Sequence, residues 1–258
     1  MGQRSAGPML WRGYPAAMEL APSLHRIGND LVNVYLVADD SGVTVVDTGV
    51  SGIWKELEPE LAAMGKSLSD VRGVLLTHGD SDHVGFAERL RTEHGVPVFV
   101  HEADAARARG EEKKPNVGLG SWKIGPLARF MWYGMLRGGF STKPIREVRT
   151  VTDGETLDLP GHPRVIHMPG HSPGSAAYSM AAVGAVFVGD ALTTGHVLTG
   201  VIGPQPAPFT QDPAQADASL DKIVPLGATW VLPGHGPPWD GGTAEAVRRV
   251  RDFASRAA

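Results

Sequence analysis

Four segments of this chain share one design, in which an apolar run typical of a strand ends in a loop that presents histidine or aspartate beside glycine or proline. The segments are VLLTHGDSDH at 74–83, VIHMPGHSPG at 165–174, AVFVGDA at 185–191 and WVLPGHGPP at 230–238. Loops at strand ends are where rigid scaffolds place functional groups. Imidazole and carboxylate groups are suitable ligands for zinc, iron or manganese. The chain must therefore fold so that four distant strand ends meet, and one shared metal centre explains all four loops.

Each of these residues also has a simpler interpretation when it is taken alone. A lone histidine is more often structural, Asp82 could be the N-cap of a helix that starts near Val84, and Asp190 could be a turn residue. The coincidence of four loops favours the metal centre. Its candidate ligands are His78, Asp82, His83, His171, Asp190 and His235. The chain contains no cysteine, so thiolate ligands and disulfides are excluded, which fits a reducing compartment.

The remaining pattern predicts a layered α/β domain, because strands and helices alternate along the chain. Two β-rich runs at 32–37 and 43–47 flank the polar tetrapeptide at 39–42, which indicates a hairpin. Helices are predicted at 53–64, at 84–94 and from Pro213 to about Leu226. Further strands are predicted at 71–77, 96–100, 164–167, 176–179, 185–188 and 229–232. A length of 258 residues is compatible with one domain over 1–258.

Residues 104–149 break this alternation, and we interpret them as an insertion within the domain. They contain ten basic and four acidic residues, a net charge of +6 against −4 for the whole chain, and five of its seventeen aromatic residues. A helix is predicted at 126–137 that is apolar nearly all round, with Arg129, Tyr133 and Arg137 as its one polar stripe. We expect such a helix to be covered.

In their order and approximate spacing, the motifs resemble those of the metallo-β-lactamase superfamily, whose pattern is H-x-H-x-D-H followed by separate His, Asp and His motifs. VVDTG at 45–49, PGHSPG at 169–174, GDA at 189–191 and PGHG at 233–236 extend the resemblance over nearly the whole chain. The resemblance implies an α/β fold of four layers, an αββα sandwich with a metal site at one edge of its sheets. The insertion would then be a helical cap over that site.

The resemblance also implies roles for individual residues. His78 and His171 would bind one metal ion, Asp82, His83 and His235 would bind the second, and Asp190 would bridge the two. Asp47 would support the site without binding metal. The implied cofactor is Zn²⁺, as two ions or one.

Position 80 departs from the family pattern, since Asp80 stands where the family has its second histidine. Asp80 could bind metal through oxygen, which would favour Mn²⁺ or Fe²⁺ relative to zinc, or the first site could be weak or empty. Two divalent ions with Asp82 and Asp190 would carry a formal charge of +2, and Asp80 would reduce it to +1. We therefore expect a less electrophilic centre, whose bound water is less acidic than in strongly activating zinc sites.

The function implied is a metal-dependent hydrolase in which a metal-bound hydroxide attacks an ester, thioester, lactone, amide or phosphoester, while Asp82 or Asp190 handles a proton. Ser172 and Ser175 are expected to be structural. A basic, aromatic cap suits a small amphiphilic or anionic substrate. The candidate substrate contacts are Trp122, Phe130, Trp132, Tyr133 and, from another loop, His196.

Alternatives stay open for both the chemistry and the insertion. The chain could be a mononuclear iron dioxygenase of the same superfamily or a non-catalytic metal-binding relative. The insertion could form a homodimer interface or an exposed basic face. A net charge of −4 and a pI near 6.2 provide no chain-wide basic field for nucleic acid. No apolar run reaches the length of a membrane span or, near the N-terminus, of a signal peptide, so we expect a cytoplasmic protein.

Overall fold

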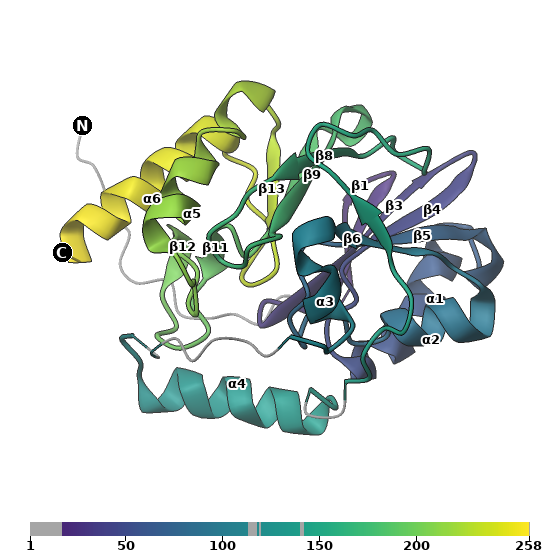
Figure 1. Cartoon of the computed structure of the whole chain (residues 1–258), viewed down its shortest axis with the longest axis horizontal. Helices are drawn as coiled ribbons and strands as arrows, with labels where there is room; N and C mark the ends of the chain where they lie inside the picture. Colours follow the sequence, from purple (N-terminus) through teal and green to yellow (C-terminus); the bar gives the residue numbers. More distant parts are fainter. Residues whose placement is uncertain (1–16, 113–117, 119, 140–141, 258) are drawn as a thin grey trace, which may run out of the picture.

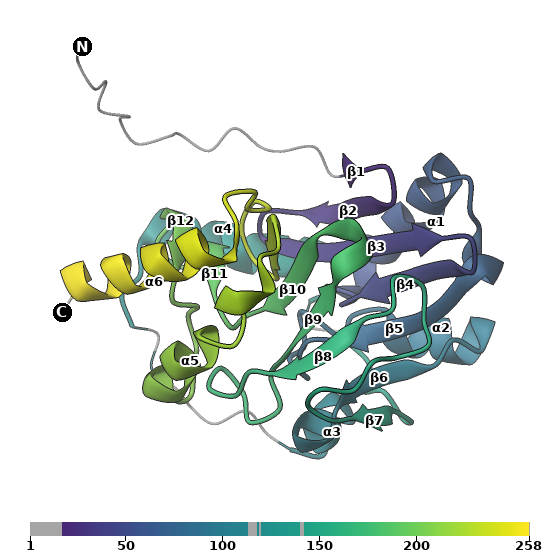
Figure 2. The ribbon, with the colours of Figure 1, turned by 90° about the horizontal axis from the view of Figure 1, so that it is seen from above.

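Two β-sheets lie face to face, with helices on both outer sides, in the computed structural model of the chain (Figures 1 and 2). The structure describes residues 17–112, 118, 120–139 and 142–257. In Figure 2, α1 (Trp54–Ala63) and α2 (Ala87–His94) lie outside one sheet, whereas α5 (Pro213–Leu220) and α6 (Thr243–Ala257) lie outside the other. The predicted αββα sandwich is confirmed.

The larger sheet has seven strands, ordered as they are in the chain. They are β1 (Met18–Ala21), β2 (Leu24–Asn29), β3 (Val32–Asp39), β4 (Gly42–Val46), β5 (Val71–Leu76), β6 (Val98–His101) and β7 (Arg149–Val151). The smaller sheet has the order β13 (Trp230–Pro233), β10 (Ala185–Gly189), β9 (Ala176–Met180) and β8 (Arg164–His167). A separate ribbon pairs β11 (Thr193–Gly195) with β12 (Ile202–Gln205). Both main sheets are mixed, because antiparallel β2–β3–β4 continues into parallel β5, β6 and β7, and β10 pairs with parallel β13.

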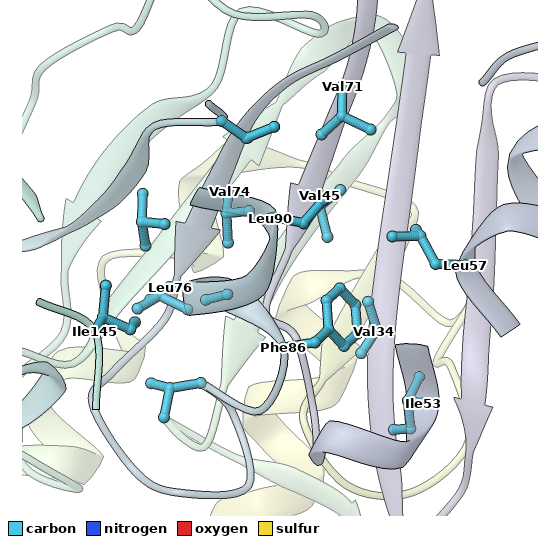
Figure 3. Close-up of a cluster of buried hydrophobic side chains, with 14 of the residues drawn as sticks. Val34, Val45, Ile53, Leu57, Val71, Val74, Leu76, Phe86, Leu90 and Ile145 are labelled. Atoms are coloured by element: carbon cyan, nitrogen blue, oxygen red, sulfur yellow. The ribbon is translucent and has the colours of Figure 1, made fainter. Parts of the chain in front are cut away.

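The alternation of side chains along the central strands builds the layers of the core. Val34 and Leu36 of β3 face α1 and α2, and their neighbours Tyr35 and Val37 face the smaller sheet. Figure 3 shows the first of these layers, in which Leu57 of α1 and the loop residue Phe86 pack against the strands. A third cluster fills the space between the smaller sheet and α6. Because the central strands of the larger sheet have apolar residues on both faces, this sheet is buried on two sides at its centre.

Most predicted elements are present, with differences at their ends. The hairpin forms as predicted, with Asp39 opposite Gly42. The predicted helix 84–94 starts only at Ala87, and α5 ends at Leu220 rather than near Leu226. Residues Val224–Leu226 form a separate 3₁₀ turn instead, because Pro225 has no N–H to donate to a continuing α-helix.

The expected insertion 104–149 has three structurally different parts. Its first residues form α3 (Ala105–Ala108), with Ala105 and Ala108 in the main core, and its last residues bring Ile145 into the same core before β7 begins. Only the middle part, with α4 (Ile124–Leu136), lies across one end of the sandwich (Figure 1). Lys113, Lys114 and Phe140, counted in the insertion's composition, lie outside the described residues, as do residues 1–16, on which the expectation about a signal peptide rested.

The prediction that the apolar helix is covered is wrong for α4, since none of its residues is buried. Its polar stripe faces the body of the protein, where Arg137 donates a hydrogen bond to Glu56 and Tyr133 packs beside the cluster that contains Val197. Leu127 and Phe130 also face the body of the protein and pack against the same cluster. Other apolar side chains of α4 are left on the outside, with Ile124 78% and Leu136 65% exposed. Among the described residues, no helix combines the length and the apolar character that crossing a membrane requires.

Candidate metal centre

Each of the four histidines in the strand-end loops is held by its Nδ1 atom. Thr77 Oγ1 lies 3.1 Å from that of His78, Asp47 Oδ2 lies 2.9 Å from that of His83, and Thr210 Oγ1 lies 3.3 Å from that of His171. The Nδ1 atom of His235 donates to the carbonyl oxygen of Leu31. Anchoring the imidazole by one nitrogen fixes its orientation and leaves Nε2 for another partner.

The second nitrogens point to one place. Nε2 of His78, His83 and His171 and Oδ1 of Asp190 are buried and have no hydrogen-bond partner within the described part of the chain. Buried polar atoms are rarely left unsatisfied, and a cluster of such atoms fits a bound cation. The donor set of imidazoles and carboxylates also fits zinc, iron or manganese.

The ligand atoms form two groups that Asp190 connects. Nε2 of His78 and Nε2 of His171 lie 3.7 and 3.5 Å from Oδ2 of Asp80, and Nε2 of His235 lies 3.5 Å from Oδ2 of Asp82. Asp190 Oδ1 is 3.7 Å from Nε2 of His83, and Asp190 Oδ2 is 3.8 and 3.3 Å from Nε2 of His171 and His235. Three sets of three residues have ligand atoms within 4.8 Å of one another: His78, Asp80 and His171; His78, His83 and Asp190; and Asp82, His83 and His235. This geometry fits two adjacent metal ions that share Asp190, and brings Asp80 to the first.

Asp47 takes a position behind the ligands. Its Oδ1 accepts a hydrogen bond from the backbone N–H of Thr77, and its Oδ2 accepts from Thr77 Oγ1 and from Nδ1 of His83. Asp47 has φ +57°, in the left-handed region that aspartate and asparagine tolerate better than most residues. It therefore ties the loop after β4 to the loop after β5 and orients His83.

The charges within the centre are strongly coupled. Burial raises the pKa of Asp190, but the charges of His235 and His83 outweigh this effect and hold it well below its usual range. Burial lowers the pKa of His83, but the carboxylates of Asp47 and Asp190 outweigh this effect and raise it to about 10. The carboxylates around His83 therefore favour positive charge there, which a metal ion would supply in place of a proton. Burial and the charge of His83 instead hold the pKa of His78 well below its usual range.

Glycine is required where the PGHG loop passes the centre. A Cβ atom on Gly234 would lie 2.4 Å from Cε1 of His83 and 2.7 Å from Oδ1 of Asp190. These separations are shorter than van der Waals contact, so any larger residue would displace two of the candidate ligands.

A family model described as the metallo-beta-lactamase superfamily matches residues 27–235. The chain belongs to the metallo-beta-lactamase superfamily. Among its relatives is "Probable metallo-hydrolase YqgX" of Bacillus subtilis, which is 27% identical to this superfamily member over 234 residues. That match covers 90% of this chain and 92% of the relative.

Solved structures of the superfamily agree. The metallo-beta-lactamase family protein TTHA1429 from Thermus thermophilus is 26% identical, with a TM-score of 0.66, and the match covers 92% of this chain and 81% of that one. TTHA1623, solved in a di-iron-bound form, is 29% identical with a TM-score of 0.55, and the match covers 83% of this chain and 92% of that one. Superfamily proteins bind metal ions, and the His and Asp residues described above are the candidate site in this member.

A pocket of about 450 Å³ lies over the candidate metal centre of this superfamily member. Its polar side is lined by Asp80, Ser81, Asp82, Arg107, Glu112, Asp190 and His235. Its other walls are largely apolar and come from α4 and from loops of both sheets: Val32, Val50, Phe130, Met131, Tyr133, Val197, Pro208 and Phe209. Part of the expected cap therefore borders the candidate site.

The predicted substrate contacts divide into two groups. Phe130 and Tyr133 line the pocket. Trp122 and Trp132 do not line it and are 50% and 60% exposed. His196 is also outside the lining, and its Nδ1 accepts a hydrogen bond from the backbone N–H of Leu198.

The sequence analysis missed two buried charged residues beside the centre. Arg107 contacts Asp80, and Asp104 accepts hydrogen bonds from both ligand-bearing loops near His78 and His171. Both were counted in the charge of the insertion, which concealed them. The available signal was their spacing of three residues across a turn and a short helix that follow the buried strand β6. Ser172 and Ser175 are buried and hydrogen-bonded to each other, in keeping with the structural role expected of them.

Proposed function

We propose that this protein is a metal-dependent hydrolase that cleaves an ester, thioester, lactone, amide or phosphoester bond in a small amphiphilic molecule. One observation carries the proposal: buried, unpartnered imidazole nitrogens surround Asp190 at the base of a pocket with apolar walls. We propose Zn²⁺ as the cofactor, as two ions or one, with Mn²⁺ or Fe²⁺ as alternatives favoured by the oxygen ligand Asp80. Metal ions held there would supply an activated water molecule and polarise the substrate's oxygen.

Asp190 and Asp82 differ in burial, and this difference suggests a different role for each. Asp190 is buried between the two ligand groups, so it is suited to hold charge in a fixed position. The side chain of Asp82 is 26% exposed and lines the pocket. Asp82 can therefore exchange a proton with a substrate or a product at its carboxylate, as general acid–base catalysis requires.

The pocket walls favour an apolar group on the substrate. Phe130, Tyr133 and Phe209 present aromatic surface beside the candidate metal ligands, and burying apolar surface contributes about 25 cal/mol per Å². Among the described residues, Arg107 is the only arginine or lysine that lines this pocket, and it contacts Asp80. We propose that the cap recognises an apolar tail or ring rather than an anionic group.

The proposal is tested by measuring bound metal and hydrolysis in Asp190→Ala and His235→Ala. We expect the purified protein to contain metal and to turn over at least one substrate in a panel of esters, thioesters, lactones and phosphodiesters that carry apolar groups. Both variants should lose metal and turnover, whereas the control His94→Ala, outside the centre, should retain both. Unchanged metal content in the two variants would contradict the assignment.

A mononuclear iron dioxygenase is the second candidate. The carboxylate of Asp80 favours iron over zinc, and the related TTHA1623 structure binds iron, although as two ions. If the protein contains one iron ion per chain and consumes oxygen only when substrate is present, the reaction is an oxygenation and not a hydrolysis. Bound metal without turnover in either assay would favour the non-catalytic relative.

A further inference from the structure

We propose that Arg107 is a positioning residue for the first metal site: it holds Oδ1 of Asp80, so that Oδ2 faces His78 and His171, and it balances the charge that Asp80 adds. This inference rests on the metal centre of the proposed function, and it concerns only how that centre accommodates aspartate where the family pattern has histidine.

The two side chains form a buried ion pair directly beside the candidate ligands. Nε and Nη2 of Arg107 both lie 2.6 Å from Oδ1 of Asp80, and the side chains are 4% and 8% exposed. Oδ2 of the same carboxylate is the atom that faces His78 and His171. With one oxygen held by the guanidinium, the carboxylate presents a single oxygen to the first group, as an imidazole would present a single nitrogen.

The positive charge of Arg107 offsets the negative charge that Asp80 would add to the centre. Asp80 would reduce the formal charge of a two-metal centre from +2 to +1, and the guanidinium in contact with Asp80 restores +2, because arginine stays protonated inside proteins. The aspartate with its arginine is thus neutral overall, like the imidazole it replaces. With Arg107 included, the formal charge of the centre equals that expected without Asp80.

The turn before Arg107 is hydrogen-bonded to both loops that carry the candidate ligands His78 and His171. In the preceding turn, Asp104 accepts hydrogen bonds from the backbone N–H of Gly79 at 2.8 Å, from Ser172 Oγ at 2.9 Å and from the backbone N–H of Gly174 at 2.7 Å. A Cβ atom on Gly79 would lie 2.7 Å from the backbone nitrogen of Ala108. Glycine at position 79 therefore lets α3 approach the ligand loop closely enough for Arg107 to reach Asp80.

The decisive experiment is a metal titration of purified, metal-stripped protein with Zn²⁺ and Co²⁺, by calorimetry and by elemental analysis after dialysis. For wild type we expect two sites. In Arg107→Met and in Arg107→Gln, the affinity of one site should fall about 10- to 100-fold, the range typical for loss of a group that orients a metal ligand, while the other site is retained. Arg107→Lys, which keeps the charge but not the forked geometry, should lose less.

A second background separates positioning from a general structural role. In Asp80→His, Arg107 becomes a buried cation that faces a metal site without its carboxylate, so adding Arg107→Met should increase first-site affinity instead of lowering it. Arg91→Met is the matched control, because it breaks a partly buried Arg–Glu88 pair away from the centre and should leave both sites unchanged. Thermal unfolding of the metal-stripped variants shows whether each remains folded.

Three outcomes would overturn the inference. In the first, Arg107→Met and Arg107→Gln bind two metal ions with wild-type affinity. In the second, Arg107→Met lowers the metal affinity equally in the wild-type and Asp80→His backgrounds. In the third, wild type holds its only metal ion in the group of Asp82, His83 and His235. Failure of wild type to bind any metal ion would instead overturn the proposed function, and this inference with it.

Discussion

At the scale of single residues, Asp47 shows how a side chain that is not a candidate ligand determines the centre. It is bonded to Thr77 and to His83, so it sets the distance between two loops and the direction of one imidazole. Its charge and its hydrogen bonds can be separated by substitution, because asparagine also tolerates a positive φ.

We expect Asp47→Asn to keep the fold and to lower the affinity of the second metal site, since His83 loses an anionic partner. Asp47→Ala should lower it further, within the range of about 10- to 100-fold that such partners contribute. Zn²⁺ titration of the metal-stripped variants measures this effect. Equal affinities in Asp47→Ala and wild type would show that His83 is oriented by other contacts.

Gly234 supports a second prediction at this scale. Gly234→Ala should reduce bound metal to one ion or none, because the added methyl group would overlap His83 and Asp190. Elemental analysis of the purified variant provides the measurement. Gly125→Ala is the matched control, since a Cβ atom there meets no atom within 4 Å, and its metal content should equal that of wild type.

At the scale of elements, the two sheets meet at a stacked pair of histidines. His101 at the end of β6 and His167 at the end of β8 have ring centroids 4.0 Å apart and planes 7° apart. Burial lowers the pKa of His101, and the charge of His167 lowers it further, against the opposing effects of Glu102, Asp104 and Asp153. Protonation of His101 is therefore disfavoured in the folded protein.

This shift predicts a loss of stability on acidification. Because the folded-state pKa lies below the unfolded value of about 6.5, the unfolded chain binds more protons as the pH falls below that value, and the free energy of unfolding decreases. Above that pH the contribution is fully present. His101→Asn removes the titration and keeps an acceptor for the N–H of Ala103.

Urea unfolding of wild type and His101→Asn at about pH 8 and about pH 5.5, on either side of the ordinary histidine pKa, tests this prediction. The wild-type free energy of unfolding should fall more between the two values than that of the variant. Identical decreases in the two proteins would mean that His101 does not contribute to the pH dependence of stability.

At the scale of the whole molecule, α4 has one side that faces the pocket and an opposite, apolar side that faces outward. One side lines the pocket through Phe130 and Tyr133, and the opposite side exposes Trp132, Met135 and Leu136. Exposed apolar patches of this kind mark interaction sites in soluble proteins. We therefore retain the proposal of a homodimer that uses this part of the insertion.

Sedimentation velocity over a range of concentrations tests the dimer. Wild type should associate as its concentration rises, and Trp132→Lys combined with Leu136→Lys should remain monomeric. Because neither residue lines the pocket, metal content should not change. A wild-type monomer at every concentration would contradict this role for α4.

The sequence by itself determined the layered fold and brought six candidate ligands into one centre. It could do so because largely apolar runs such as β3 and β5 alternate with helical segments along the chain, and because the loops after β5, β8, β10 and β13 carry their ligand types in short motifs. Only the tertiary structure decided the partners of those ligands. Three features depend on distances between segments that lie far apart in the chain, and no local pattern encodes such distances. They are the contact of Arg107 with Asp80, the hydrogen bonds of Asp104 to two loops, and the outward apolar side of α4.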